Sequence, residues 1–229
     1  MEKKTLEQSN KKYIRTYISL LKDNMLTKPF VIGICGGSGS GKTTLLRRIS
    51  ETFQDKDPAI FSMDNYYRPI QLQATDAKGV INFDLPTALD EFRLVADLEK
   101  LIEGSPITVK EYFFNSPPDK NVLITIFPSK LVIVEGLFLF HYPEVRDFID
   151  YSIFVEVDDK IQLDRRLYRD QETRGYKRND IIYQWENHVL PCYQNYILPY
   201  KKNADFIFYN DHRSEEQYKT LHQILEKLL

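Results

Sequence analysis

Apolar residues along the chain recur in two periods, and these periods alternate. Continuous apolar runs typical of buried strands lie at 30–35, 59–62, 130–140, 151–157 and 204–210. Apolar residues at helical spacing lie at 43–53, 94–102, 158–203 and 214–229. Strands that alternate with helices are typical of a parallel sheet covered on both faces, so the pattern predicts an α/β fold.

Two further segments complete the predicted organisation. Ile14, Ile18, Leu21 and Met25 recur at helical spacing, which predicts an amphipathic helix over about the first 27 residues. We therefore expect a helical extension at 1–28 and a single domain at 29–229. The runs at 107–114 and 121–127, joined by a Pro-bearing stretch, predict two short strands.

The composition limits the kinds of binding partner that we expect. The 229 residues include 31 Lys plus Arg and 33 Asp plus Glu, a formal charge of −2, which gives no general attraction for nucleic acid or an anionic membrane. No apolar run approaches the roughly 20 residues of a membrane span. Two cysteines are too few for a disulfide framework. We expect a cytoplasmic protein with no nucleic-acid or membrane partner, and surface or cap positions for its four histidines.

The stretch GGSGSGKT, residues 36–43, follows one predicted strand and opens a helix. This is the pattern and the setting of a phosphate-binding P-loop. Backbone N–H groups of such a loop surround phosphate oxygens, the lysine reaches the β- and γ-phosphates, and the Ser/Thr hydroxyl binds Mg²⁺. The predicted nucleotide-binding residues are Gly36, Gly37, Ser38, Gly39, Ser40, Gly41, Lys42, Thr43 and Thr44.

Other P-loop classes fit less well. A GTPase needs N-K-x-D, which is absent, and the D-x-x-G match at 76–79 lies in a polar stretch, where we interpret it as chance. An ATP-driven motor or transporter usually needs more chain for a coupled domain. At this length a small-molecule kinase is favoured. A non-catalytic nucleotide-binding regulator is the alternative from another class.

A kinase of this kind needs a proton acceptor, a second Mg²⁺ contact and cations that neutralise the transferred phosphoryl group. Asp64 follows one buried strand and Glu135 ends another. Parallel strands direct these ends toward the ligand crevice. Asp64 is therefore the candidate base and Glu135 the candidate metal-facing acid.

The candidate cations lie on the predicted helix that follows residue 158. Arg165, Arg166 and Arg169 fall on one side of it, opposite Leu163 and Leu167. Arg174 continues the cluster and is followed by Gly175. Such a helix could close over a bound nucleotide as a lid and exclude water.

A resemblance to a known family covers about residue 30 to the C-terminus. It is carried by seven segments, which occur in the order GGSGSGKTT, MDNYY, NFDLP, VKEYFF, VIVEG, RRLYRDQETRG and ILPYKKNADFIF. They resemble the uridine kinase branch of the uridine kinase and phosphoribulokinase family. The resemblance implies a P-loop NTPase-type parallel sheet flanked by helices, a small β-hairpin over the acceptor site and a helical lid. It also implies a homo-oligomer, with ATP as donor, GTP left open as an alternative, and Mg²⁺.

The resemblance further implies residue roles for phosphoryl transfer to the 5'-hydroxyl of a ribonucleoside. Lys42 and Arg169 join Asp64 in catalysis, Arg174 contacts phosphate, and Thr43 and Glu135 face the metal. Asp84 and Arg166 grip the ribose hydroxyls. The remaining implied acceptor contacts are Tyr67, Phe83, Tyr112, Phe114 and Gln184.

The chain departs from the family pattern where the base is read. Pro117 stands in place of a histidine, Tyr176 in place of an arginine and Leu85 in place of a histidine. A pocket without those donors loses one basis for discriminating bases. We therefore expect weaker uridine and cytidine selectivity, and a phosphoribulokinase-like or other hydroxyl kinase activity stays an alternative.

Overall fold

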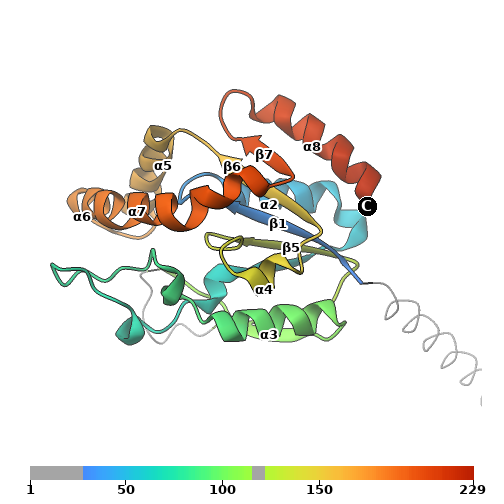
Figure 1. Ribbon diagram of the computed structural model, residues 1–229, viewed down its shortest axis with the longest axis horizontal. Coiled ribbons are helices and arrows are strands. Elements are labelled where there is room, and N and C mark those ends of the chain that lie inside the picture. The colour runs from blue at the N-terminus through green and yellow to red at the C-terminus, as the bar shows by residue number, and fades with distance from the viewer. Residues whose placement is uncertain (1–27, 115–121) are drawn as a thin grey trace, which may run out of the picture.

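A five-stranded parallel sheet forms the centre of the computed structural model, which describes residues 28–114 and 122–229 (Figure 1). Its strand order is β2-β5-β1-β6-β7. The strands are β1 (Phe30–Gly36), β2 (Ala59–Ser62), β5 (Leu131–Gly136), β6 (Tyr151–Glu156) and β7 (Phe206–Tyr209). The predicted α/β fold is confirmed. The helix expected over the first 27 residues, and Pro117, fall outside the described residues.

The period of two along β1 distributes its side chains to the two faces of the sheet. Val31 and Cys35 belong to one buried cluster, and Ile32 and Ile34 belong to the other. Helices α2 (Lys42–Thr52) and α8 (Ser214–Leu228) cover the second face, while α3 (Glu91–Ile102) and α4 (Pro143–Arg146) cover the first (Figure 1). Both faces of the sheet are therefore sealed, as its continuous apolar strands require.

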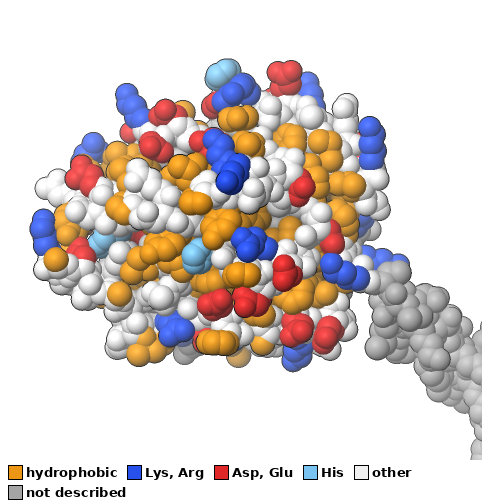
Figure 2. All heavy atoms as spheres, in the orientation of Figure 1, with side chains coloured by type: hydrophobic (Ala, Val, Ile, Leu, Met, Phe, Trp, Pro, Cys, Tyr) orange, Lys and Arg blue, Asp and Glu red, His pale blue; other side chains and the backbone are white. Residues whose placement is uncertain are grey.

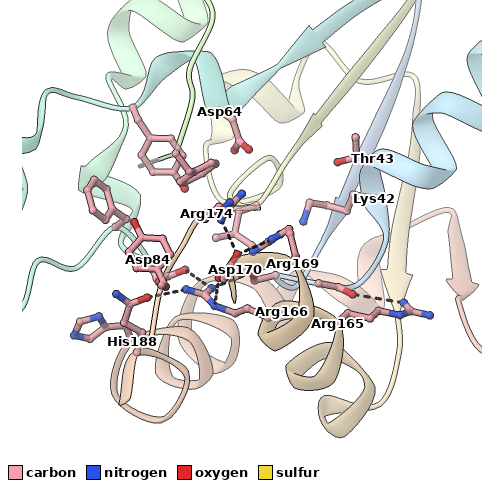
Figure 3. Close-up of a pocket in the computed structure, with 18 of the residues that line it drawn as sticks. Lys42, Thr43, Asp64, Asp84, Arg165, Arg166, Arg169, Asp170, Arg174 and His188 are labelled. Carbon is pink, nitrogen blue, oxygen red and sulfur yellow. Dashed lines mark hydrogen bonds and ion pairs between the residues drawn. The ribbon is translucent and has the colours of Figure 1, made fainter. Parts of the chain in front are cut away.

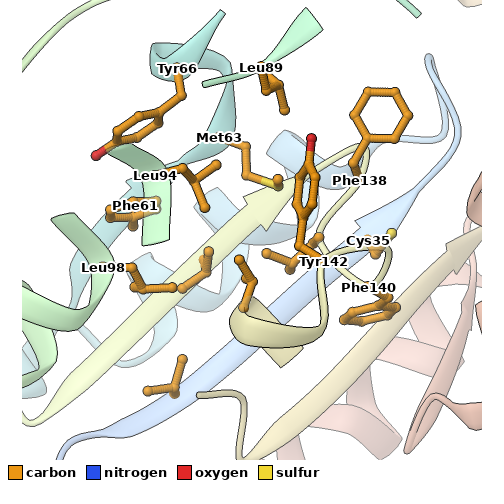
Figure 4. Close-up of a cluster of buried hydrophobic side chains, with 14 of the residues drawn as sticks. Cys35, Phe61, Met63, Tyr66, Leu89, Leu94, Leu98, Phe138, Phe140 and Tyr142 are labelled. Carbon is orange, nitrogen blue, oxygen red and sulfur yellow. The ribbon is translucent and has the colours of Figure 1, made fainter. Parts of the chain in front are cut away.

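Helix α3 packs on the sheet through a cluster of buried apolar side chains (Figure 4). The Asp90 carboxylate caps the helix by accepting from Arg93 N at 3.3 Å, and the helix stops just before Gly104, whose φ of +88° suits the left-handed position after a helix. Leu94 and Leu98 are fully buried. They pack with Phe61, Met63, Tyr66 and Phe138.

The two short strands predicted beside α3 form a separate antiparallel hairpin. They are β3 (Ile107–Lys110) and β4 (Leu123–Ile126). Ile107 and Val109 point into the α3 cluster, and their neighbours along β3 are exposed. The strand thus has the alternation of a half-buried edge.

The segment predicted to be helical at 158–203 is helical except for a break at 173–177, and it contains two π-helical turns. Arg166 is as buried as Leu167, so the expected division into a basic side and an opposite apolar side is wrong at Arg166, whose guanidinium lies inside the protein. The elements are α5 (Asp159–Glu172), α6 (Arg178–Gln184), a π turn (Trp185–Val189), α7 (Leu190–Cys192), a π turn (Tyr193–Ile197) and a 3₁₀ turn (Leu198–Asn203).

The visible surface carries no large area of one charge. Figure 2 shows basic and acidic side chains interspersed with apolar ones, in keeping with the small net charge. None of the helices within 28–114 and 122–229 has the length and apolar character needed to cross a bilayer.

Truncating Leu98 tests the α3 core. Leu98→Ala removes a fully buried side chain and should lower the free energy of unfolding by about 2–5 kcal/mol. Urea unfolding followed by circular dichroism measures the change. Phe92→Ala on the same helix is the matched control, because Phe92 is 84% exposed, and it should stay within about 0.5 kcal/mol of wild type. Equal losses in both variants would contradict the assigned burial.

Candidate active site

The P-loop lies between β1 and α2, and its backbone takes conformations that glycine allows. Gly39 and Gly41 have φ of +79° and +99°, in the left-handed region where other residues are strained. A Cβ on Gly39 would also lie 2.7 Å from the Gln162 carbonyl oxygen. Helix α2 begins at Lys42. Its free N–H groups and positive end therefore adjoin the loop, as anion binding requires.

Three side chains donate hydrogen bonds to backbone carbonyls of the loop. Lys42 Nζ donates to the carbonyls of Gly36 and Gly37 at 3.0 and 3.1 Å. The Ser40 carbonyl accepts from Asn210 Nδ2 at 2.7 Å and from an Arg165 guanidinium N–H at 3.3 Å. Ser40 is fully buried and, unlike Ser38, Gly39 and Gly41, does not line the cavity.

Two carboxylates meet at the ends of β2 and β5. The register pairs Ser62 with Glu135, and the Ser62 hydroxyl donates to Glu135 Oε1 at 2.8 Å while it accepts from Asp64 N at 3.3 Å. Burial raises the pKa of both Asp64 and Glu135, the Asp64 charge raises that of Glu135 further, and Lys42 opposes both shifts. The predicted acids are thus adjacent, and both face the P-loop lysine.

One buried carboxylate contacts three arginines, two in α5 and one just after it. Asp170 is 1% exposed, and its Oδ1 accepts from Arg169 Nε at 2.8 Å and lies 3.1 Å from an Arg174 guanidinium nitrogen. Arg166 Nε lies 3.2 Å from Oδ2 (Figure 3). Sequence reasoning missed Asp170. Its spacing of four residues from both Arg166 and Arg174 was the available signal.

Arg166 links this cluster to the P-loop and to the predicted acceptor residues. Its two terminal nitrogens donate to Ser38 Oγ and Gln184 Oε1, each at 3.1 Å. One of them also lies 3.9 Å from Asp84 Oδ1. Burial raises the pKa of Asp84, and Arg166 is the largest opposing influence. The predicted pair of Asp84 and Arg166 is therefore close, although not in direct hydrogen-bond contact.

Four aromatic rings pack together at one side of the site. Tyr67 lies 4.9 Å from Tyr112, 5.6 Å from Phe114 and 6.1 Å from Phe83 between ring centroids. The Arg174 guanidinium sits 3.9 Å from the Phe114 ring centroid, a cation–π distance. Tyr112 backs Tyr67 and does not line the cavity, whereas the other three rings do.

These groups surround one cavity of about 380 Å³. In Figure 3, Lys42 and Thr43 lie at one end, Asp84 and His188 at the other, and Asp64 faces the arginine cluster across the space. His188 is 2% exposed, so the expectation of surface or cap positions is wrong for this histidine. The cavity-lining residues that the sequence reasoning did not place in the site include Ile81, Leu137, Asp170 and His188.

The residues present fit a magnesium ion bound together with phosphate. The Thr43 hydroxyl and the carboxylates of Asp64 and Glu135 line the same cavity, and Mg²⁺ prefers a few such oxygen ligands together with substrate phosphates and water. No cluster of three or more His, Cys, Asp or Glu suited to a metal occurs in the described part of the chain.

Comparison with known proteins decides the family. Residues 31–214 match the phosphoribulokinase and uridine kinase family. The chain belongs to this family. A uridine kinase of Deinococcus deserti is 36% identical over 180 residues, which cover 79% of this chain and 87% of the relative. Uridine-cytidine kinase B of Dictyostelium discoideum is 35% identical over 78% of this chain and 74% of its own length.

Solved structures of the family share the fold. A possible uridine kinase from Bacillus stearothermophilus superimposes with a TM-score of 0.58 at 22% identity, covering 86% of this chain and 99% of its own. The phosphoribulokinase from Rhodobacter spheroides gives a TM-score of 0.62 at 18% identity, over 80% and 70% of the two chains. The P-loop kinase fold and the resemblance inferred from seven sequence segments are both confirmed.

Removing the charge of Asp64 should raise the free energy of unfolding of this protein at neutral pH. Because the pKa of Asp64 is raised on folding, the folded state holds the proton more tightly, and ionised Asp64 lowers stability above the unfolded pKa of about 3.9. We expect Asp64→Asn to raise the thermal midpoint at pH 7 by roughly 2 °C or more. The gain should disappear as the pH falls below about 4.

The exposed Asp164 supplies the control for this measurement. Asp164→Asn should leave the midpoint unchanged at each pH. A lower midpoint for Asp64→Asn at pH 7, or a gain that does not depend on pH, would contradict the raised pKa.

Proposed function

We propose that this kinase transfers the γ-phosphoryl group of ATP to the 5'-hydroxyl of a ribonucleoside. One observation carries the proposal. A single cavity joins the P-loop lysine and threonine to the buried carboxylate of Asp64, and then to the Asp84–Arg166 pair. A phosphate donor, a proton acceptor and a site for a diol thus follow one another along one space.

The donor end is positive on two sides. Lys42 is held by carbonyls of its own loop, and a phosphate in the loop can replace them as the partner of its ammonium group. Arg169 and Arg174 line the same cavity from the opposite wall. These cations stabilise negative charge on the transferred phosphoryl oxygens. Mg²⁺ held at Thr43 and Glu135 would neutralise further phosphate charge.

Asp64 is the proton acceptor in this proposal. The acceptor oxygen forms a bond to the γ-phosphorus, the bond from that phosphorus to the β–γ bridging oxygen breaks, and ADP leaves. The hydroxyl proton passes to the Asp64 carboxylate. Burial raises the pKa of Asp64, which makes the carboxylate a stronger base.

The acceptor end offers complementary partners for two neighbouring hydroxyls. The Asp84 carboxylate accepts from a hydroxyl, and the Arg166 guanidinium donates to one. Phe83 and Phe114 can stack on a flat ring, a contact that tolerates many bases. Tyr176 lines the cavity but cannot supply a guanidinium fork. Relatives named uridine kinase support a nucleoside acceptor.

Asp64→Asn should lower kcat by roughly 10² to 10⁴, because it removes the proton acceptor and keeps the size of the side chain. Steady-state kinetics and ATP binding by calorimetry test this. ATP should still bind to this variant, whereas Lys42→Ala should weaken ATP binding as well. A kcat within about threefold of wild type, which is well under 1 kcal/mol of barrier, would make the carboxylate structural.

A substrate panel tests the acceptor. We compare kcat/KM for uridine, cytidine, adenosine, 2'-deoxyuridine and ribulose 5-phosphate with ATP. Adenosine should stay within about 100-fold of uridine, because stacking discriminates bases weakly. Deoxyuridine should be roughly tenfold poorer or worse, since an unpaired buried Asp84 costs about 1–3 kcal/mol or more. Preference for ribulose 5-phosphate, or equal use of uridine and deoxyuridine, overturns the proposal.

A further inference from the structure

The D-x-x-G stretch at 76–79, interpreted from the sequence as a chance match, is an anchored turn. Asp76 Oδ1 accepts from the backbone N–H groups of Lys78 and Val80 at 2.8 and 2.9 Å. Gly79 completes the turn with a φ of +77°, which glycine adopts without strain. The turn therefore fixes its own carboxylate by backbone contacts alone and leaves the second oxygen for another partner.

That second oxygen holds one side chain of α6 and one of the π turn that follows it. Asp76 Oδ2 accepts from the Tyr183 hydroxyl at 2.7 Å and lies 2.8 Å from His188 Nε2. The Tyr183 and His188 rings meet edge to face, with centroids 5.9 Å apart. These partners, 107 and 112 residues away from Asp76 along the chain, fix the position and the tilt of the imidazole.

The same contacts fix which nitrogen carries hydrogen. The hydrogen bonds from Tyr183 and His188 and from the turn hold the pKa of Asp76 well below its usual range, so it is a carboxylate and can only accept. Nε2 of His188 must then be the donor, and Nδ1 is left to bond another group. Within residues 28–114 and 122–229, Nδ1 makes no hydrogen bond and is not among the sealed polar atoms.

The imidazole lies at the acceptor end of the cavity. His188 lines the cavity together with Asp84 and Gln184, and Figure 3 shows it near Asp84 and far from Lys42. Burial raises the pKa of Asp84, and His188 follows Arg166 among the groups that oppose this shift. The imidazole thus borders the same space as the Asp84–Arg166 pair.

The local helix geometry explains why the spacing did not reveal this placement. His188 lies in the π turn Trp185–Val189, just before Pro191, which has no N–H to donate to the preceding turn. The wider turn changes the angle between successive side chains, and such turns are frequent at functional sites.

We propose that His188 is a specificity-determining residue of the acceptor site, whose Nδ1 forms a hydrogen bond with the 2'- or 3'-hydroxyl of the ribose. Asp76 is its positioning residue, and Tyr183 supports Asp76. This inference rests on the proposed nucleoside kinase function and adds a third polar partner for the diol.

His188→Phe tests the proposal, because it keeps a ring of similar size and removes both nitrogens. We measure kcat/KM for uridine, 2'-deoxyuridine and 3'-deoxyuridine at saturating ATP. Uridine should lose about tenfold or more through a higher KM. The deoxy analogue that lacks the partner hydroxyl should change less than about threefold, so the preference for uridine over that analogue should shrink. The KM for ATP should not change.

Two more variants separate positioning from folding. His222→Phe makes the same exchange on α8, outside the cavity, and should leave all kinetic constants unchanged. Asp76→Asn keeps the His188 ring but replaces an acceptor of four hydrogen bonds. It should raise the KM for uridine and leave the KM for ATP and for the insensitive deoxy analogue unchanged.

Equal losses for uridine and both deoxy analogues in His188→Phe would assign the residue to packing and overturn this inference alone. Unchanged uridine kinetics would overturn it too. If the wild-type enzyme phosphorylated no nucleoside, both this inference and the proposed function would fall.

Discussion

The arrangement of the site depends on one buried carboxylate among three guanidinium groups. Without Asp170, Arg166, Arg169 and Arg174 would place like charges together in a region of low dielectric, where unpaired charge is costly. With Asp170 they form a fixed positive wall opposite Asp64. Arg166 then extends this wall to Ser38 and Gln184, so that the donor and acceptor ends are joined through a single side chain.

Parallel topology creates the opposite wall. The carboxyl ends of β1, β2 and β5 meet at one edge, and there the chain places the P-loop, Asp64 and Glu135. Burying two acids beside each other lowers stability, as the raised pKa of each shows. In the proposed reaction, the same burial prepares Asp64 to take a proton, and both carboxylates face the cations of the bound nucleotide site. Stability and chemistry therefore oppose each other at this edge.

The sequence predicted what depends on local patterns and fixed spacing. The P-loop, the strand-end acids and the sheet follow from short motifs and from the alternation of periods, and the family was evident from ordered segments. Asp170 was missed because its value lies in which charges surround it in space. The pairing of Asp76 with His188 was missed because it joins distant segments through a π turn. The expected homo-oligomer and the extension at 1–28 stay predictions.

Identifying the phosphorylated oxygen tests the central claim most directly. The enzyme is incubated with ATP, Mg²⁺ and uridine, and the product is analysed by two-dimensional ¹H–³¹P NMR. The account predicts a single phosphate ester coupled to the 5'-methylene protons, formed in equal amounts with ADP. A phosphate on the 2'- or 3'-oxygen, or ADP formed without any nucleotide product, would contradict it.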